Sequence, residues 1–139
     1  MRLYVGWFWL KLGLDKFYAG WLSGESQFLP DELNRLAAPH WFDVAFVDAA
    51  RSHVFLFQWL VVVFEVLFGA LLMAGAVARV AGIVLAAMAA VWFIATGYDA
   101  HAWMIPMALM SLTLAAAAAG RYLGVDAILR ARLVKVPLF

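Results

Sequence analysis

Four apolar segments dominate the chain, and polar stretches separate or follow them. The segments cover residues 3–22, 54–78, 80–98 and 102–119, with a polar stretch at 23–53 and a basic tail at 120–139. Each segment has close to the roughly 20 residues that an α-helix needs to cross the hydrocarbon core of a bilayer. The pattern predicts an all-α integral membrane protein, a single domain over residues 1–139 in which four transmembrane helices form a bundle.

The second and third segments are separated by little more than Arg79, so a turn is expected there. A single helix over residues 54–98 would be about 67 Å long at about 1.5 Å per residue, against a hydrocarbon core of about 30 Å. The chain must therefore reverse near Arg79. We expect Gly75 and Gly82 to supply the backbone freedom that this turn needs.

The polar stretch 23–53 is expected to be a structured outer loop between the first two helices. Pro30 begins a Pro-Asp-Glu sequence, which is typical of a helix start. Three aromatic rings in the loop suit the headgroup layer of a membrane: Trp41, Phe42 and Phe46. We therefore predict one or two short helices that lie on or cap the outer end of the bundle.

Basic residues set the expected orientation, because Lys and Arg in short loops stay on the cytoplasmic side. With both termini inside, the inner side holds Arg2, Arg79, Arg121, Arg130, Arg132 and Lys135, and the outer side holds Arg35 and Arg51. This predicts an N-in, C-in topology. The basic tail is expected to hold the C-terminus at the anionic lipid surface, with docking to a partner subunit as the alternative. So few charges beside a membrane do not indicate nucleic-acid binding.

Composition agrees with a membrane protein and excludes several kinds of chemistry. Hydrophobic residues make up 68% of the 139 residues, charged residues make up 14%, and the mean hydropathy is +0.92. An ordinary soluble domain has about 45–50% apolar and about 25% charged residues. The chain has no Cys, which excludes disulfides, thiolate catalysis, Cys-ligated zinc and iron–sulfur clusters.

Histidines lie outside the four apolar segments, at His40, His53 and His101. A haem held between the helices is therefore not expected, because its axial His would have to lie inside a span. Asp99 beside His101 could shuttle protons at the outer surface, and a solvated turn is the simpler interpretation. The spacing of the three histidines matches no zinc motif, so no metal site is predicted.

Polar side chains inside the first two predicted spans are the main candidates for a site. They are Lys11, Asp15, Lys16, Tyr18 and Glu65, and the formal charges of the four ionised members sum to zero. A charge at the centre of an isolated helix costs about 2.5–3.5 kcal/mol on insertion scales, so such groups usually face partners inside a bundle. We expect a buried polar cluster, which is either an ion cluster that fixes helix register or a functional site. For Lys16, snorkelling of the ammonium group to the membrane surface is a sufficient alternative.

The first helix also has a glycine stripe on the side opposite its polar face. Gly6, Gly13 and Gly20 fall within a narrow arc, about 160–180° from Lys11 and Asp15. Small residues let neighbouring helices approach closely in a membrane. We predict that this stripe packs against another helix.

Three motifs in order along the chain resemble those of the DoxX/DoxD membrane family. The first is VGWFWLKLGLDKFYAG, which contains a Gly13-to-Lys16 element after an N-terminal Arg. The second is an acidic residue, two glycines and a turn arginine, at Glu65, Gly69, Gly75 and Arg79. The third and most specific is Gly120-Arg121-Tyr122-Leu123-Gly124-Val125-Asp126, which is similar to the family's Gly-Arg-x-Leu-Gly-Leu-Asp ending. The resemblance covers almost the whole chain.

The resemblance implies a four-helix subunit of the cytoplasmic (inner) membrane of a bacterium. The DoxD branch resembles the quinone-reducing membrane subunit of thiosulfate:quinone oxidoreductase. On that basis the motif residues are candidates for function: Lys16, Glu65, Gly69, Gly75, Arg79, Gly120, Arg121, Gly124 and Asp126. Since the chain lacks Cys, no persulfide forms on it, and sulfur chemistry is expected on a partner or to be noncovalent.

A quinone would need an apolar slot for its tail, hydrogen-bond donors for its carbonyl oxygens, and a route for protons. The polar cluster could supply donors and protons, and four rings could line the slot: Trp7, Trp9, Trp59 and Phe64. No haem, cluster or flavin motif is present, so we expect at most a subunit of a quinone-linked oxidoreductase and not a standalone enzyme. The expected partners are membrane lipids and other membrane subunits.

Two other functions stay open at this point. The chain could be a noncatalytic accessory subunit that stabilises a larger respiratory or photosynthetic membrane complex. It could also be a small transporter that uses the buried charges, which is the least favoured hypothesis because the two halves of the sequence show no convincing repeat.

Overall fold

The computed structural model describes residues 1–23, 39–96, 102–117 and 124–126, and every regular element in these ranges is helical. Several predicted features lie outside the described residues: the helix start at Pro30, the turn with Asp99 and His101, Gly120, Arg121 and the tail from residue 127 onward.

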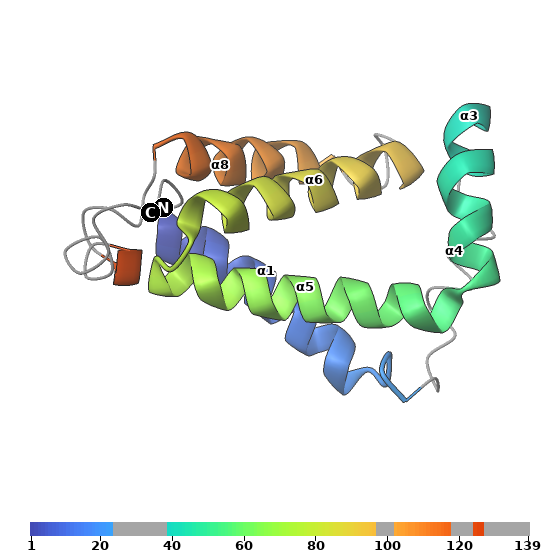
Figure 1. Cartoon of the computed structure of the whole chain (residues 1–139), viewed down its shortest axis with the longest axis horizontal. Helices are drawn as coiled ribbons and strands as arrows, with labels where there is room; N and C mark the ends of the chain where they lie inside the picture. The colour runs from blue at the N-terminus through green and yellow to red at the C-terminus, as the bar shows by residue number, and fades with distance from the viewer. Residues whose placement is uncertain (24–38, 97–101, 118–123, 127–139) are drawn as a thin grey trace.

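Four long helices make up the body of the molecule. They are α1 (Arg2–Tyr18), α5 (Val54–Ala74), α6 (Ala78–Thr96) and α8 (Met104–Ala116). All four follow the long axis, and consecutive helices in this order run in opposite directions (Figure 1). α1 packs mainly on α5, α8 packs mainly on α6, and α5 and α6 join the two pairs. The described helices therefore have the arrangement of an up-and-down bundle.

Two of these helices, α5 and α6, are long and apolar enough to cross a membrane. α1 has 17 residues and carries three charged side chains, Lys11, Asp15 and Lys16, in addition to Arg2 at its start. α8 has 13 described residues, about 20 Å of helix. The all-helical fold is confirmed for the described part of the chain, and the prediction that four helices span the membrane stays a prediction.

The chain reverses between α5 and α6 where the sequence predicts a turn. α5 ends at Ala74, Gly75 follows in the left-handed conformation with φ of +68°, and Val77 also has a positive φ of +50°. A left-handed residue after a helix is a common C-terminal cap, and glycine adopts it without steric cost. Gly82 was expected to loosen the same turn, which is wrong. It lies inside α6, where a Cβ atom would come within 2.5 Å of the Ser111 carbonyl oxygen in α8.

A helical arm stands across one end of the bundle, where the sequence predicts short helices (Figure 1). It consists of α3 (His40–Phe42), the π-helical segment η1 (Asp43–Val47) and α4 (Asp48–Ser52). The apolar side of the arm forms a core cluster with the adjoining ends of α5 and α6. Trp41 is exposed, as a headgroup contact requires, but Phe42 is buried and Phe46 packs beneath the arm, so that prediction is wrong for these two rings.

Glycines bring α1 and α5 into direct backbone contact. A Cβ atom on Gly69 would lie 2.6 Å from the backbone nitrogen of Leu10, and one on Gly6 would lie 2.8 Å from that of Met73. Gly13 has a similar contact with Val66. Gly6 and Gly13 thus form the predicted packing stripe. Gly20, by contrast, lies in the turn after α1 with φ of +79° and does not belong to the stripe.

Candidate functional site

A buried ion pair joins α1 to the middle of α5. Lys16 Nζ donates hydrogen bonds to both carboxylate oxygens of Glu65, at 2.8 Å to Oε1 and 2.6 Å to Oε2. The Glu65 side chain is 1% exposed and the Lys16 side chain 18% exposed. Each charge therefore has a partner at a position where an isolated charge would be costly.

The surroundings of this pair fix its position. Gly13 lies opposite Glu65, so that a Cβ atom there would be 3.0 Å from the Glu65 Cβ. The missing side chain lets α1 come close enough for Lys16, one turn further on, to reach the carboxylate. The ammonium group also lies 5.6 Å from the ring centroid of Trp21, a distance at which a cation is attracted to the ring face. Snorkelling alone does not describe Lys16, because its ammonium group points to α5.

The other three members of the predicted cluster lie elsewhere. Lys11 and Asp15 form an ion pair within α1, and their side chains are 59% and 56% exposed. Tyr18 is 80% exposed. The structure thus brings Lys16 and Glu65 together and places Lys11, Asp15 and Tyr18 on the outer face of α1, so the five residues do not form one buried cluster.

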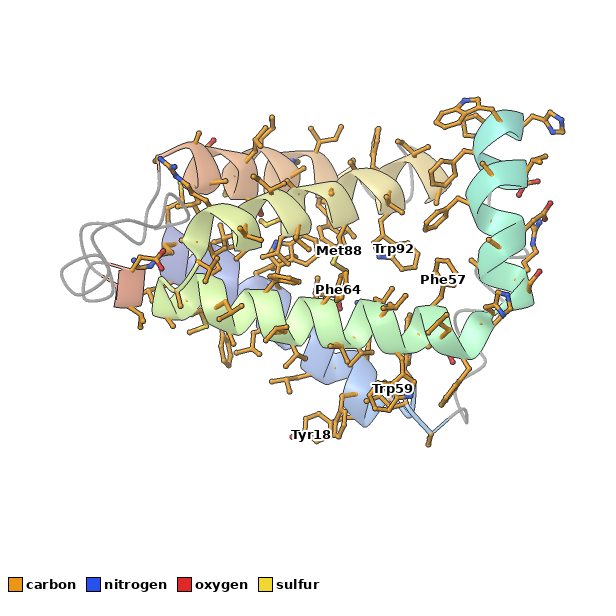
Figure 2. All side chains as sticks on the ribbon, in the orientation of Figure 1. Tyr18, Phe57, Trp59, Phe64, Met88 and Trp92 are labelled. Atoms are coloured by element: carbon orange, nitrogen blue, oxygen red, sulfur yellow. The ribbon has the colours of Figure 1, made fainter. Side chains whose placement is uncertain are left out.

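An apolar cavity of about 380 Å³ lies between α5, α6 and the arm. All of its lining side chains are apolar or aromatic: Phe46, Val47, Ala50, Phe57, Leu60, Val61, Phe64, Ile83, Val84, Ala87, Met88, Val91, Trp92 and Ala95. Figure 2 shows Phe57 and Phe64 of α5 pointing toward Met88 and Trp92 of α6 across this space. Its volume lies within the range of about 300–1,000 Å³ that is typical of small-molecule sites.

Trp7, Trp9, Trp59 and Phe64, which were predicted to line one slot, do not line the same cavity. Phe64 lines the cavity, whereas Trp59 and Tyr18 lie on the opposite side of α5 (Figure 2). Trp7 is exposed and Trp9 is fully buried. The cavity lies on the side of α5 that faces α6, and Trp7, Trp9 and Trp59 do not line it.

The arm lines one end of the cavity, mainly with residues of its π-helical segment η1. Phe46 and Val47 belong to η1 and line the cavity, and Ala50 of α4 lies beside them. π-helical turns are rare and occur often at functional sites. Arg51 of α4 pairs with Asp43, the first residue of η1, and with Asp48, the first residue of α4, at 3.3 Å and 3.0 Å from its Nη1.

Motif residues meet at the end of the bundle opposite the arm (Figure 1). The Asp126 carboxylate accepts hydrogen bonds from the backbone N–H groups of Val77 at 2.6 Å and Ala78 at 3.0 Å, and the Asp126 N–H donates to the Gly75 carbonyl oxygen at 2.9 Å. Asp126 therefore caps the N-terminus of α6 from a distant part of the chain. Gly124 lies against Gly75 and the Arg2 guanidinium. Arg79 is half-buried in the first turn of α6.

One buried polar contact was missed by the sequence analysis. Trp9 Nε1 donates a hydrogen bond to Ser111 Oγ at 3.3 Å, which links α1 to α8 in the core. The sequence feature that indicates this contact is Ser111, which lies in an apolar helix. A hydroxyl group that is buried in such a helix needs a hydrogen-bond partner. Its partner could not be predicted without knowing which helices are neighbours.

The described residues contain no group of three or more His, Asp or Glu side chains that could hold a metal ion. His40 and His53 are exposed at the two ends of the arm. His101 lies outside the described residues, and the absence of a metal site stays a prediction.

Fold and site define a helical protein with two membrane-capable helices, a buried ion pair and a lateral apolar cavity. A family model described as TQO small subunit DoxD matches residues 1–138. The chain therefore belongs to the DoxD family, as the sequence motifs predicted, and it is a membrane protein. No curated protein and no solved structure matches it.

Proposed function

We propose that the chain is the membrane-embedded small subunit of a thiosulfate:quinone oxidoreductase-type complex and that it binds quinone in the cavity between α5 and α6. In this proposal the four helices cross the cytoplasmic membrane of a bacterium with both termini inside. Family membership supports the redox role, and the apolar cavity is the observation that carries the quinone assignment.

The cavity has the chemistry that an isoprenoid quinone tail requires. Its lining presents aliphatic and aromatic surface from two membrane-capable helices, and burial of apolar area contributes about 25 cal/mol per Å². At the rim, Leu60 is 40% exposed and Ile83 is 55% exposed. When α5 and α6 span a bilayer, this rim faces lipid, so a tail enters sideways without crossing water.

Electrons must come from another subunit. The sequence has no Cys and no haem, cluster or flavin motif, so in this proposal a partner delivers the two electrons released by thiosulfate oxidation. The quinone takes up these two electrons with two protons to form the quinol. The role of this chain is to hold the acceptor at the membrane side of the complex.

We assign the Lys16–Glu65 pair a positioning role in this scheme. Glu65 directly follows the lining residue Phe64 in the sequence. The Glu65 side chain nevertheless lies on the side of α5 that contacts α1, whereas the cavity lies on the side of α5 that contacts α6. The contact of Lys16 with both carboxylate oxygens of Glu65 fixes the position of α1 along α5. Because α1 then covers one side of α5, the cavity forms on the side that faces α6.

The function is tested in membranes of a strain from which the gene for this chain is deleted and then restored. Thiosulfate-dependent reduction of the membrane quinone is expected to be lost on deletion and to return with the restored chain. The remaining subunits are quantified in the same membranes. Loss of those subunits with unchanged turnover per remaining complex would instead support the noncatalytic accessory role, and an unchanged total rate with intact subunits would contradict both.

A further inference from the structure

The lining of the cavity changes in character along the bundle. Toward the arm it is aromatic, because Phe46 belongs to η1, Phe57 to the first turn of α5 and Trp92 to the last two turns of α6. Toward the middle of the bundle it is mainly aliphatic, with Leu60, Ile83, Val84, Ala87 and Met88. Figure 2 shows Phe57 and Trp92 nearer the arm than Phe64 and Met88. The two ends of the cavity therefore suit different chemical groups.

The aromatic end of the cavity is closed, and the aliphatic end is open at its side. Val47, Ala50 and Ala95 line the arm end and are 0%, 2% and 4% exposed. By contrast, Phe64 is 37% exposed and Ile83 is 55% exposed. A ligand that enters between α5 and α6 therefore has its leading group beneath the arm and its trailing group at the open side.

The volume of the cavity fits a ring and part of a tail. An apolar cavity of about 150 Å³ binds benzene, and this cavity has about 380 Å³. By that comparison it has space for a substituted quinone ring and about one to two isoprene units. The rest of a longer tail stays in the lipid outside.

The supply of protons favours the arm end for the ring. Reduction of a quinone to the quinol consumes two protons with the two electrons, and these protons come from water. Phe64 is the eleventh of the 21 residues of α5, whereas Phe57 is the fourth. When α5 spans a bilayer, Phe64 is therefore in the middle of the hydrocarbon core, which holds no water, and Phe57 is close to the aqueous surface.

We propose that the quinone binds ring first, with its ring among Phe46, Phe57 and Trp92 beneath the arm and its tail leading out past Ile83 into lipid. This inference rests on the proposed function and assigns the ring-binding residues of that site. Phe46 and Phe57 meet edge to face with 5.3 Å between their ring centroids, and aromatic rings attract a further flat ring in offset-stacked or edge-to-face geometry. Among the described lining side chains, Trp92 alone carries an N–H group, and a quinone carbonyl oxygen accepts from such a donor.

Photolabelling of the wild-type complex locates the ring. The probe is a quinone that carries an azido group on its ring and an isoprenoid tail, and it is illuminated with the complex purified in mild detergent. Labelled peptides are identified by mass spectrometry, with and without an excess of the same quinone lacking the azide. Label that the excess abolishes is expected on the arm and on the adjoining ends of α5 and α6, and not around Ile83.

Substitutions at the two ends of the cavity separate the ring from the tail. The complex is assayed for thiosulfate-dependent reduction of menadione, a naphthoquinone ring without a tail, and of a menaquinone, which adds an isoprenoid tail to that ring. Trp92→Leu is expected to raise the KM for both quinones about tenfold, because a contact with the ring is lost. Ile83→Ala is expected to raise the KM for menaquinone more than the KM for menadione, because the tail passes this position.

The outcomes distinguish the orientation of the quinone from its presence. Competed label around Ile83 with none near the arm, or an effect of Trp92→Leu on menaquinone alone, would overturn the ring-first orientation and leave quinone in the cavity. The complete absence of competed label on this chain would instead contradict the proposed function. If Trp92→Leu does not accumulate, the position of the label in the wild-type complex decides.

Discussion

The ammonium group of Lys16 lies against both carboxylate oxygens of Glu65, so neither charge is unpaired between α1 and α5. A buried pair of this kind adds little net stability compared with apolar side chains of the same size, but removal of one partner leaves an uncompensated charge. At the scale of the residue, the role that we propose for the pair is therefore to exclude other helix registers. The sequence allowed two interpretations of the buried charges, an ion cluster that fixes helix register and a functional site. This role corresponds to the first.

A double-mutant cycle on this pair measures that effect. Glu65→Met is expected to lower the free energy of unfolding by about 3–5 kcal/mol, because Lys16 then has no counter-ion. Lys16→Met together with Glu65→Met is expected to restore most of the loss. The measurement is unfolding in detergent followed by circular dichroism, with Asp48→Asn in the exposed Arg51–Asp48 pair as the control. Equal losses for Glu65→Met and Asp48→Asn would contradict the account.

Sequence alone predicted which residues carry charge inside the helices but not how they are paired. The Lys11–Asp15 pair is consistent with its i, i+4 spacing, because that contact is local to one helix. The partner of Lys16 depends on where α1 lies on α5, which is set by a contact 49 residues apart in the chain. Asp126 likewise matched a motif, while its capping of α6 needed the tertiary structure.

At the scale of the element, the close contact between α1 and α5 depends on glycines. Gly6, Gly13 and Gly69 each leave no space for a Cβ atom, and two of the three meet backbone atoms of the facing helix within 2.8 Å. Without an exclusion of water to drive helix association in lipid, such close packing is a main source of stability. The stripe on α1 was predictable from its spacing, except for Gly20, which follows the end of the helix.

Substitution of Gly69 by Ala tests the importance of this contact. The new Cβ atom would meet Leu10 backbone nitrogen at 2.6 Å, so α1 must move away from α5. We expect a loss of about 1–3 kcal/mol in unfolding free energy, typical of overpacking. Ala70→Leu, at the next and exposed position, is the control and is expected to unfold like the wild type. Indistinguishable stability of the two variants would show that the helices do not meet at this contact.

At the scale of the whole molecule, the arm, α5 and α6 together form a cavity that no single element contains. The apolar runs predicted the helices, and the turn at Gly75 predicted that α5 and α6 are neighbours. The cavity itself was not predictable, because it depends on the angle between these helices and on the arm that covers one end of the space. The predicted slot consequently has only Phe64 in common with this cavity.

Quinone content of the purified complex tests the central claim most directly. Ala87→Phe adds a ring to the cavity lining, and Ala90→Phe adds the same ring to an exposed position of α6 outside the lining. The complex is purified in mild detergent, and its quinone is extracted and quantified per chain. We predict that Ala90→Phe retains the wild-type content and that Ala87→Phe loses about tenfold, equivalent to about 1.4 kcal/mol of binding free energy. Equal quinone content in the two variants would contradict a quinone site between α5 and α6.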